Sequence, residues 1–145
     1  MPTRTATTSW TGGLMDGSGT VELTSSKAGS FDVSFPKRAA KDADGTTSPE
    51  ELIAAAHASC YAMQLSHVLA EAGGTPQTLE VTANVTVDRQ PAGGLNVTTS
   101  ALTVRGSVDG LDAAGFLKAA ETAKLGCPIS KALAGVDITL DAALA

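Results

Sequence analysis

The sequence predicts an α+β fold with antiparallel strands and long helices, in the element order βββαββααβ. Three observations lead to this prediction. Short β-rich runs fill the first third of the chain, one long helical segment occupies the middle, and alternating apolar and polar residues follow it. With 145 residues, no internal repeat and no linker, the chain is expected to form a single domain over residues 1–145.

The N-terminal third is expected to be a three-stranded meander. β-rich runs occupy residues 3–10, 19–25 and 30–35, and glycine-containing turns separate them. Residues 36–47 are polar and lack a regular apolar pattern, so they are expected to form a loop that leads to the central helix.

The central helix is expected to begin at Ser48 and to end at Gly73 and Gly74. Ser48 is a good N-cap, Pro49 suits the first helical position, and Glu51 completes a Ser-x-x-Glu capping box. Apolar side chains fall on nearly every side of this segment, which predicts a helix that is buried all round.

Beyond the helix, alternating apolar residues over 79–87 predict a strand, and the turn at 91–94 leads into a second strand over 95–108. The apolar residues of the second strand change from odd to even positions, which predicts a bulge near Thr99 and Ser100.

The last quarter of the chain is expected to hold two helices and a strand. Helical spacing returns over 111–125, and Gly126 is expected to end that helix. Pro128 then suits the first position of a short helix after Cys127. Alternation over 136–141 predicts the final strand.

Composition disfavours several partners. The net charge of −5 offers no basic surface for nucleic acid or for an anionic membrane, and no run of about 18 apolar residues predicts a membrane span. The first residues lack the pattern of a secretion signal, so a cytoplasmic location is expected. In that reducing compartment, two cysteines are not expected to form a static disulfide, although they can cycle between thiol and disulfide.

Cys60, in the middle of the central helix, is the candidate reactive residue, with His57, Gln64 and His67 on the same stripe. Burial would raise the pKa of its thiol unless a cation reaches it. An arginine is the best choice because it stays charged when buried, and Glu50 in the first helical turn is placed to orient it. The candidate cations are Lys37, Arg38, Lys41, Arg89 and Arg105.

Cys127 competes with Cys60 as the more acidic thiol. It occupies the N-cap of the short helix, where backbone N–H groups favour a thiolate. Other interpretations stay open at this point. Cys60 alone is typical of a core residue, the Cys-Pro-Ile-Ser sequence matches a redox motif that has lost one thiol, and the chain's His and Cys residues permit a zinc site with non-standard spacing.

The chain resembles the OsmC branch of the OsmC/Ohr hydroperoxide reductases. The motifs that carry the resemblance are T-S-P-E-E-L-I-A-A-A-H-A-S-C-Y-A-M, E-A-G-G-T-P, K-L-G-C-P-I-S-K-A-L and the closing D-I-T-L-D. The resemblance runs from Ser9 to Leu140 and implies the OsmC-like fold, as an intertwined homodimer with central helices packed against antiparallel sheets.

The resemblance also implies a function. It makes Cys60 the peroxidatic thiolate, Cys127 the resolving thiol, Arg38 the activating arginine and Glu50 the carboxylate that orients it. The implied activity is reduction of organic hydroperoxides to alcohols in oxidative or osmotic stress, without metal or organic cofactor, with a dithiol or a lipoyl-bearing protein as reductant. The alternatives are a non-catalytic ligand-binding or stress protein on the same fold, and a zinc-binding protein.

Overall fold

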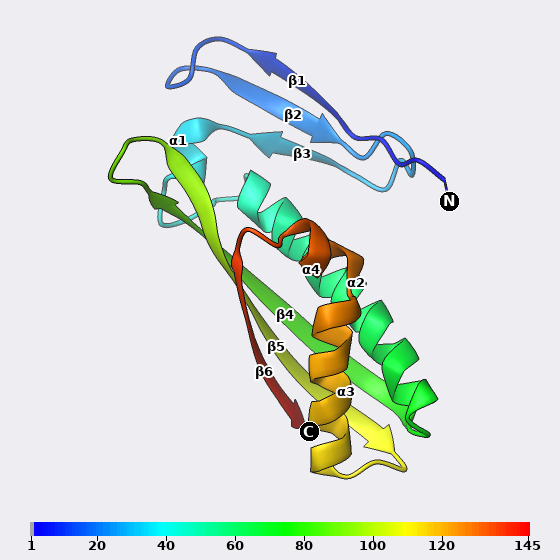
Figure 1. Cartoon of the computed structure of the whole chain (residues 1–145). Helices are drawn as coiled ribbons and strands as arrows, with labels where there is room; N and C mark the ends of the chain where they lie inside the picture. Colours follow the sequence, from blue (N-terminus) through cyan, green and yellow to red (C-terminus); the bar gives the residue numbers. More distant parts are fainter. Residues whose placement is uncertain (1) are drawn as a thin grey trace. The chain divides into compact units, whose positions relative to one another are not determined.

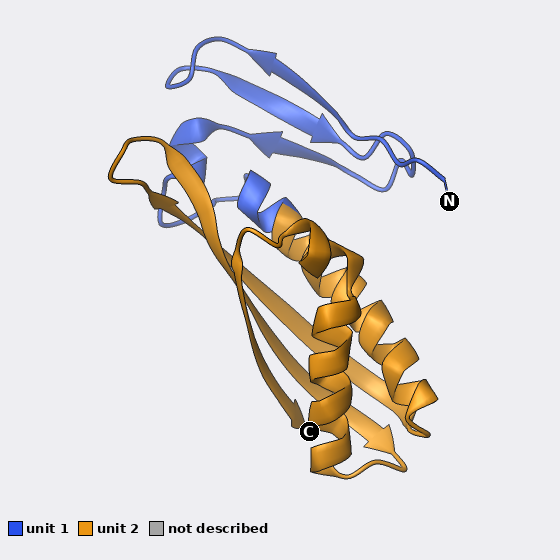
Figure 2. Ribbon diagram, viewed as in Figure 1, with its two compact units in different colours: residues 1–52 blue, residues 53–145 orange. Residues whose placement is uncertain are grey.

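The computed structural model describes residues 2–145, which divide into two compact units at Leu52 and Ile53 (Figure 2). Figure 1 labels the elements, which in chain order are β1 (Thr7–Thr11), β2 (Ser18–Glu22), β3 (Ser30–Val33), α1 (Phe35–Arg38), α2 (Pro49–Glu71), β4 (Thr75–Arg89), β5 (Leu95–Asp109), α3 (Ala113–Gly126), α4 (Pro128–Ala132) and β6 (Asp137–Leu144).

Unit 1 contains the predicted meander. Strands β1, β2 and β3 form an antiparallel sheet in that order, so the three-stranded prediction is confirmed with shorter strands. The prediction of an uninterrupted loop over 36–47 was wrong at its start, where α1 forms one helical turn. The Ser34 hydroxyl accepts a hydrogen bond from the Lys37 backbone N–H, and Pro36 has the φ that a first turn requires.

Helix α2 begins where the sequence predicts, with the Ser48 half of the predicted capping box. The Glu51 backbone N–H donates to the Ser48 hydroxyl at 3.2 Å, which caps the helix, and the Glu51 carboxylate accepts a hydrogen bond from the Thr47 hydroxyl. The chain leaves the helix through Gly73, whose positive φ of 86° suits a glycine.

The prediction that α2 is buried all round was wrong for the single chain. Tyr61, Leu65 and Leu69 are fully buried at intervals of four residues, whereas Met63 is 71% exposed. Residues 53–145 supply one sheet and one other long helix, which cover a single stripe of α2.

Unit 2 holds a second three-stranded sheet in the order β4, β5, β6. β4 and β5 form the predicted antiparallel hairpin, and their register shifts where Thr86 and Val87 pair with Thr99 and Val97, which places a bulge at the predicted site. β6 pairs with β5 in parallel, so the prediction that all strands are antiparallel was wrong. The intervening helices α3 and α4 form the crossover that a parallel pair requires.

The core of unit 2 lies between its sheet and its helices. Figure 1 shows α2 and α3 over one face of the sheet. Leu102 and Val104 of β5 pack with Phe116 of α3 and with Tyr61 and Leu65 of α2. Among residues 2–145, no helix is long and apolar enough to cross a membrane.

Candidate active site

Cys60 and Cys127 lie together in unit 2, although 67 residues separate them in the sequence. Both are free thiols; Cys60 is half-buried in α2 and Cys127 is fully buried at the junction of α3 and α4. The Cys127 side chain lies close enough to the Cys60 sulfur to raise the pKa of the Cys60 thiol. The fold therefore creates a dithiol from two cysteines on different helices.

The surroundings of Cys60 act in both directions on its acidity. Burial raises the pKa of the Cys60 thiol, and the neighbouring Cys127 sulfur raises it further. A hydrogen bond from the Ile129 backbone N–H opposes both effects and lowers the pKa, but the net direction is upward. An additional positive charge is needed to make Cys60 a strong nucleophile near neutral pH.

Cys127 does not use the N-terminus of α4 as its local sequence predicts. It occupies the N-cap position, but its side chain makes no capping hydrogen bond. The Ile129 N–H of that first turn instead serves the Cys60 sulfur. The tertiary fold thus transfers to Cys60 a favourable contact that local reasoning gave to Cys127.

His57 lies one turn before Cys60 and is completely buried. Its Nδ1 is 2.7 Å from the Ser100 hydroxyl of β5, and its Nε2 is 2.8 Å from the Ser130 hydroxyl of α4. Burial lowers the pKa of the His57 imidazole, so the ring is held in its neutral form. A neutral ring has one donor and one acceptor nitrogen, and hydroxyls satisfy both.

Arg38 and Glu50 form a closely bonded ion pair within unit 1. Arg38 Nε donates to both Glu50 carboxylate oxygens at 3.1 Å, and Nη2 donates to Oε1. Burial raises the pKa of Glu50, but the Arg38 guanidinium and further hydrogen bonds outweigh it and hold the pKa below its ordinary value. Glu50 is thus an ionised carboxylate that fixes the orientation of Arg38.

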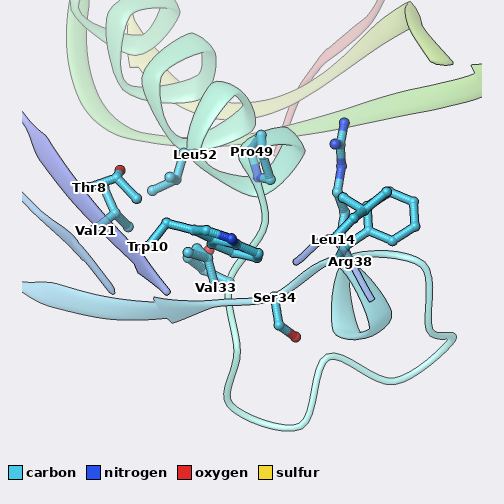
Figure 3. A pocket seen from close by; sticks show the side chains of 11 residues that line it. Thr8, Trp10, Leu14, Val21, Val33, Ser34, Arg38, Pro49 and Leu52 are labelled. Atoms are coloured by element: carbon cyan, nitrogen blue, oxygen red, sulfur yellow. The ribbon is translucent and has the colours of Figure 1, made fainter. Parts of the chain in front are cut away.

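Unit 1 also contains a largely apolar cavity of about 440 Å³. Figure 3 shows the Trp10, Val33 and Leu52 side chains gathered along it, with Arg38 at the end away from Thr8 and Val21. The arginine of the ion pair therefore borders a space that suits an apolar molecule.

Comparisons with known proteins identify the family. Residues 41–141 match the sequence profile described as OsmC-like protein. The chain is 41% identical over 132 residues to Peroxiredoxin OsmC of Escherichia coli (strain K12), covering 91% of this chain and 90% of that relative, and equally to the protein of the same name from Shigella flexneri. The chain belongs to the OsmC-like family.

Solved structures of the OsmC-like fold agree. An organic hydroperoxide resistance protein from Elizabethkingia anophelis has a TM-score of 0.81 at 26% identity and covers 100% of this chain and 98% of its own. The organic hydroperoxide resistance protein OhrB of Bacillus subtilis has a TM-score of 0.74 at 29% identity and covers 95% of this chain and 97% of its own. The α+β, OsmC-like fold class is therefore confirmed.

The remaining candidate residues lie elsewhere. Lys37 pairs with Asp44 and Arg105 pairs with Asp141, each at 2.8–2.9 Å. His67 is exposed beside Glu71. Within residues 2–145, no group of three His, Cys, Asp or Glu side chains is arranged to hold a metal ion.

Sequence reasoning missed the residues that contact His57 and Cys60 from other elements. Ser100 and Ser130 are separated from His57 by 43 and 73 residues, so no local motif links them. One signal was available, since a histidine on an otherwise apolar stripe needs buried hydrogen-bond partners.

Proposed function

We propose that this OsmC-like protein is a cysteine-based peroxidase that reduces organic hydroperoxides to alcohols. The observation that carries the proposal is the contact between Cys60 and Cys127 in unit 2. Two further findings support it, namely the relative named Peroxiredoxin OsmC and the structural neighbours named organic hydroperoxide resistance proteins.

In the first step, the Cys60 thiolate attacks one peroxide oxygen of ROOH and the O–O bond breaks. Cys60 becomes a sulfenic acid, and the departing alkoxide takes up a proton to leave as ROH. Arg38, oriented by Glu50, is proposed to stabilise the thiolate and the developing alkoxide charge. The raised pKa of Cys60 within unit 2 is the reason such a cation is required.

In the second step, the Cys127 thiol condenses with the Cys60 sulfenic acid. A Cys60–Cys127 disulfide forms, and the sulfenic hydroxyl leaves as water with the Cys127 proton. An external dithiol then returns both cysteines to thiols by two exchange reactions and is itself oxidised to a disulfide. A lipoyl-bearing protein is proposed as that dithiol, and no metal or organic cofactor takes part.

The proposed substrates are hydroperoxides with an apolar group rather than hydrogen peroxide. The apolar cavity beside Arg38 supports this choice, because an apolar wall strengthens binding of an alkyl chain and offers hydrogen peroxide little.

The proposed assembly is a homodimer in the cytoplasm, in which the two units of each chain act as one domain. The exposed side of α2, including Met63, supports a homodimer because a second chain would remove apolar surface from water. Sedimentation velocity gives the mass directly, and a species of about 14.5 kDa would reject the dimer.

The decisive experiment is a free-thiol count before and after one equivalent of cumene hydroperoxide, with mass spectrometry of the products. We expect both thiols to disappear as an intramolecular Cys60–Cys127 disulfide, faster than with hydrogen peroxide. Cys60→Ser should abolish the reaction, while Cys127→Ser should stop after one oxidation of Cys60. Activity that persists in Cys60→Ser would reject the assignment.

The cavity also favours a second candidate function, a non-catalytic protein that binds apolar ligands in unit 1. The same experiment separates the two functions. A pure binding protein would keep both thiols in the presence of hydroperoxide, although it would still bind cumyl alcohol.

A further inference from the structure

His57 is fully buried and makes two hydrogen bonds, yet the reaction proposed above does not use it. Buried polar side chains are costly unless every donor and acceptor is satisfied, and this one is satisfied by hydroxyls from two other elements. The ring connects α2 to β5 through Ser100 and to α4 through Ser130. It therefore joins three elements of unit 2 at one point.

The connection to α4 adds to two other contacts of this short helix, namely the packing of Ile129 against the core and the Ile129 N–H at the Cys60 sulfur. The helix has only five residues, Pro128–Ala132, which is too short to be stable by itself. Ser130 is the residue of α4 that is buried, and its hydroxyl is the one that meets His57 Nε2. Cys127 is the N-cap of this helix and also the C-cap of α3, where its N–H donates to the Ala123 carbonyl at 2.8 Å, so its position depends on both helices.

The Cys60–Cys127 and His57–Ser130 contacts between α2 and α4 have the same spacing of three residues on both segments. Cys60 meets Cys127, while His57, three residues earlier on α2, meets Ser130, three residues later in the chain. Residues three apart lie on one side of a helix, so the pairs form two points along one antiparallel contact. Together with the Ile129 N–H at the Cys60 sulfur, these two points fix the orientation of α4 against α2.

We propose that His57 is a positioning residue that holds α4, and with it Cys127, against Cys60 through its hydrogen bond to Ser130. The proposal rests on the proposed peroxidase function for its consequence, which is rapid closure of the disulfide after Cys60 is oxidised. Holding two reacting groups together raises their effective concentration. The hydrogen bond between Nδ1 and the Ser100 hydroxyl keeps the ring in the orientation that the contact with α4 requires.

The test compares Ser130→Ala with a matched control, Tyr61→Phe. Tyr61 is also fully buried on α2, and its hydroxyl donates to the Ala120 carbonyl of α3 at 3.0 Å, so this control removes a buried hydrogen bond that goes to α3 and not to α4. Ser130→Thr restores the hydroxyl. Ser100→Ala, which frees the other ring nitrogen, is the second variant if Ser130→Ala does not fold.

The first readout is the fraction of Cys60–Cys127 disulfide in glutathione redox buffers, which requires no hydroperoxide. We expect the equilibrium constant for disulfide formation to fall about tenfold in Ser130→Ala, as for loss of one buried hydrogen bond worth about 1.4 kcal/mol. Ser130→Thr should recover most of this loss, Ser100→Ala should show a smaller fall, and Tyr61→Phe should match the native protein.

The second readout is the competition for the Cys60 sulfenic acid after one equivalent of cumene hydroperoxide in the presence of dimedone. The ratio of dimedone adduct to disulfide depends only on events after oxidation, and it should rise about tenfold in Ser130→Ala. Equal ratios and equal glutathione equilibria in Ser130→Ala and native protein would overturn the proposal, as would an equal shift in Tyr61→Phe.

The two readouts separate this inference from the proposed function. If cumene hydroperoxide leaves both thiols intact while the glutathione equilibrium responds to Ser130→Ala, the peroxidase function is wrong and the positioning role stands. If native protein reacts with hydroperoxide but neither readout responds to Ser130→Ala, the positioning role is wrong and the peroxidase function stands.

Discussion

Arg38 Nε lies 3.1 Å from each carboxylate oxygen of Glu50, and Nη2 bonds the same carboxylate. This geometry uses the planar fork of the guanidinium, which a lysine ammonium cannot reproduce. The side chain of Glu50 is mostly buried, so its charge depends on Arg38 for compensation.

Replacing Arg38 with lysine should therefore damage the proposed reaction even though the charge is retained. We expect Arg38→Lys to lower the second-order rate constant for thiol oxidation by cumene hydroperoxide by about 10²-fold, the size of effect found for one lost oxyanion donor. Stopped-flow thiol consumption measures this constant.

Lys37 supplies the matched control for that experiment. It is the neighbouring cation, but it bonds the exposed Asp44 at 2.9 Å. Lys37→Gln should leave the rate constant within about twofold, as expected for an exposed ion pair of small energy. An unchanged rate constant in Arg38→Lys would mean that the positive charge at this position, and not the Arg38–Glu50 geometry, governs the rate.

The same ion pair predicts a loss of stability in acid. Because Arg38 holds the pKa of Glu50 below its ordinary value of 4.5, the folded state binds the proton less readily than the unfolded state does. The pair contributes stability above about pH 4.5, and this contribution is lost as the pH falls through the lower, folded-state pKa of Glu50.

Glu50→Gln isolates this effect from that of other carboxylates. We expect the difference in melting temperature between native protein and Glu50→Gln to be large and nearly constant above about pH 5 and to shrink as the pH falls below about 4.5. Thermal unfolding followed by circular dichroism at several pH values measures it. A difference that stays constant with pH would show that the Glu50 charge does not stabilise the fold.

The thiol pair gives a prediction about acidity. The Cys127 sulfur is one of the groups that raise the pKa of Cys60, after burial. Cys127→Ala removes it while retaining the Ile129 N–H, so the pKa of Cys60 should fall. The pH profile of iodoacetamide alkylation, followed by mass spectrometry of the Cys60 peptide, should shift to lower pH than in native protein; an upward shift would contradict this account.

The sequence predicts the structure correctly at positions where local structure depends on neighbouring residues. The Ser48 cap, the alternation of β4 and the bulge opposite Thr86 follow from local patterns, and the structure has each of them. Arg38 and Glu50 were also named together, although that pairing came from the resemblance to a family.

Predictions from local patterns were wrong or missing where the structure depends on an element that is distant in the sequence. The parallel pairing of β6 depends on how α3 and α4 carry the chain across the sheet, which alternation alone does not show. The N–H of Ile129 serves Cys60 and not Cys127, because the fold brings another helix to that turn. The partners of His57 lie 43 and 73 residues away, beyond any local motif.

Packing between β5 and α3 requires a glycine at position 106. A Cβ there would lie 2.9 Å from both Leu79 Cδ2 and Phe116 Cε2, closer than core atoms pack. We expect Gly106→Ala to lower the free energy of unfolding by about 1–3 kcal/mol, the usual cost of overpacking a core. Urea denaturation measures the change.

Gly135 is the control for this substitution. A Cβ at Gly135 would meet no heavy atom within 4 Å. Gly135→Ala should therefore change the free energy of unfolding by no more than about 0.5 kcal/mol. If Gly106→Ala changed the free energy of unfolding equally little, β5 and Phe116 would have to be farther apart than they are in the structure.

His57 predicts a second pH dependence, closer to neutrality. Burial lowers the pKa of His57 below its ordinary value of 6.5. As the pH falls, the His57 side chain is therefore protonated more readily in the unfolded chain than in the folded chain. The free energy of unfolding is therefore highest, as far as His57 determines it, above about pH 6.5, and it declines as the pH falls toward the folded-state pKa of His57. The slope from one such group is at most about 1.4 kcal/mol per pH unit.

Urea denaturation between pH 7.5 and pH 5.5 tests this expectation with two histidine variants. His67 lies on the same helix, but its side chain is 63% exposed, so His67→Gln should keep the native decline in free energy of unfolding. His57→Gln should be less stable at pH 7.5 and should lose most of the decline, because glutamine takes up no proton. A decline that persisted in His57→Gln would show that the buried ring is not the source of the pH dependence.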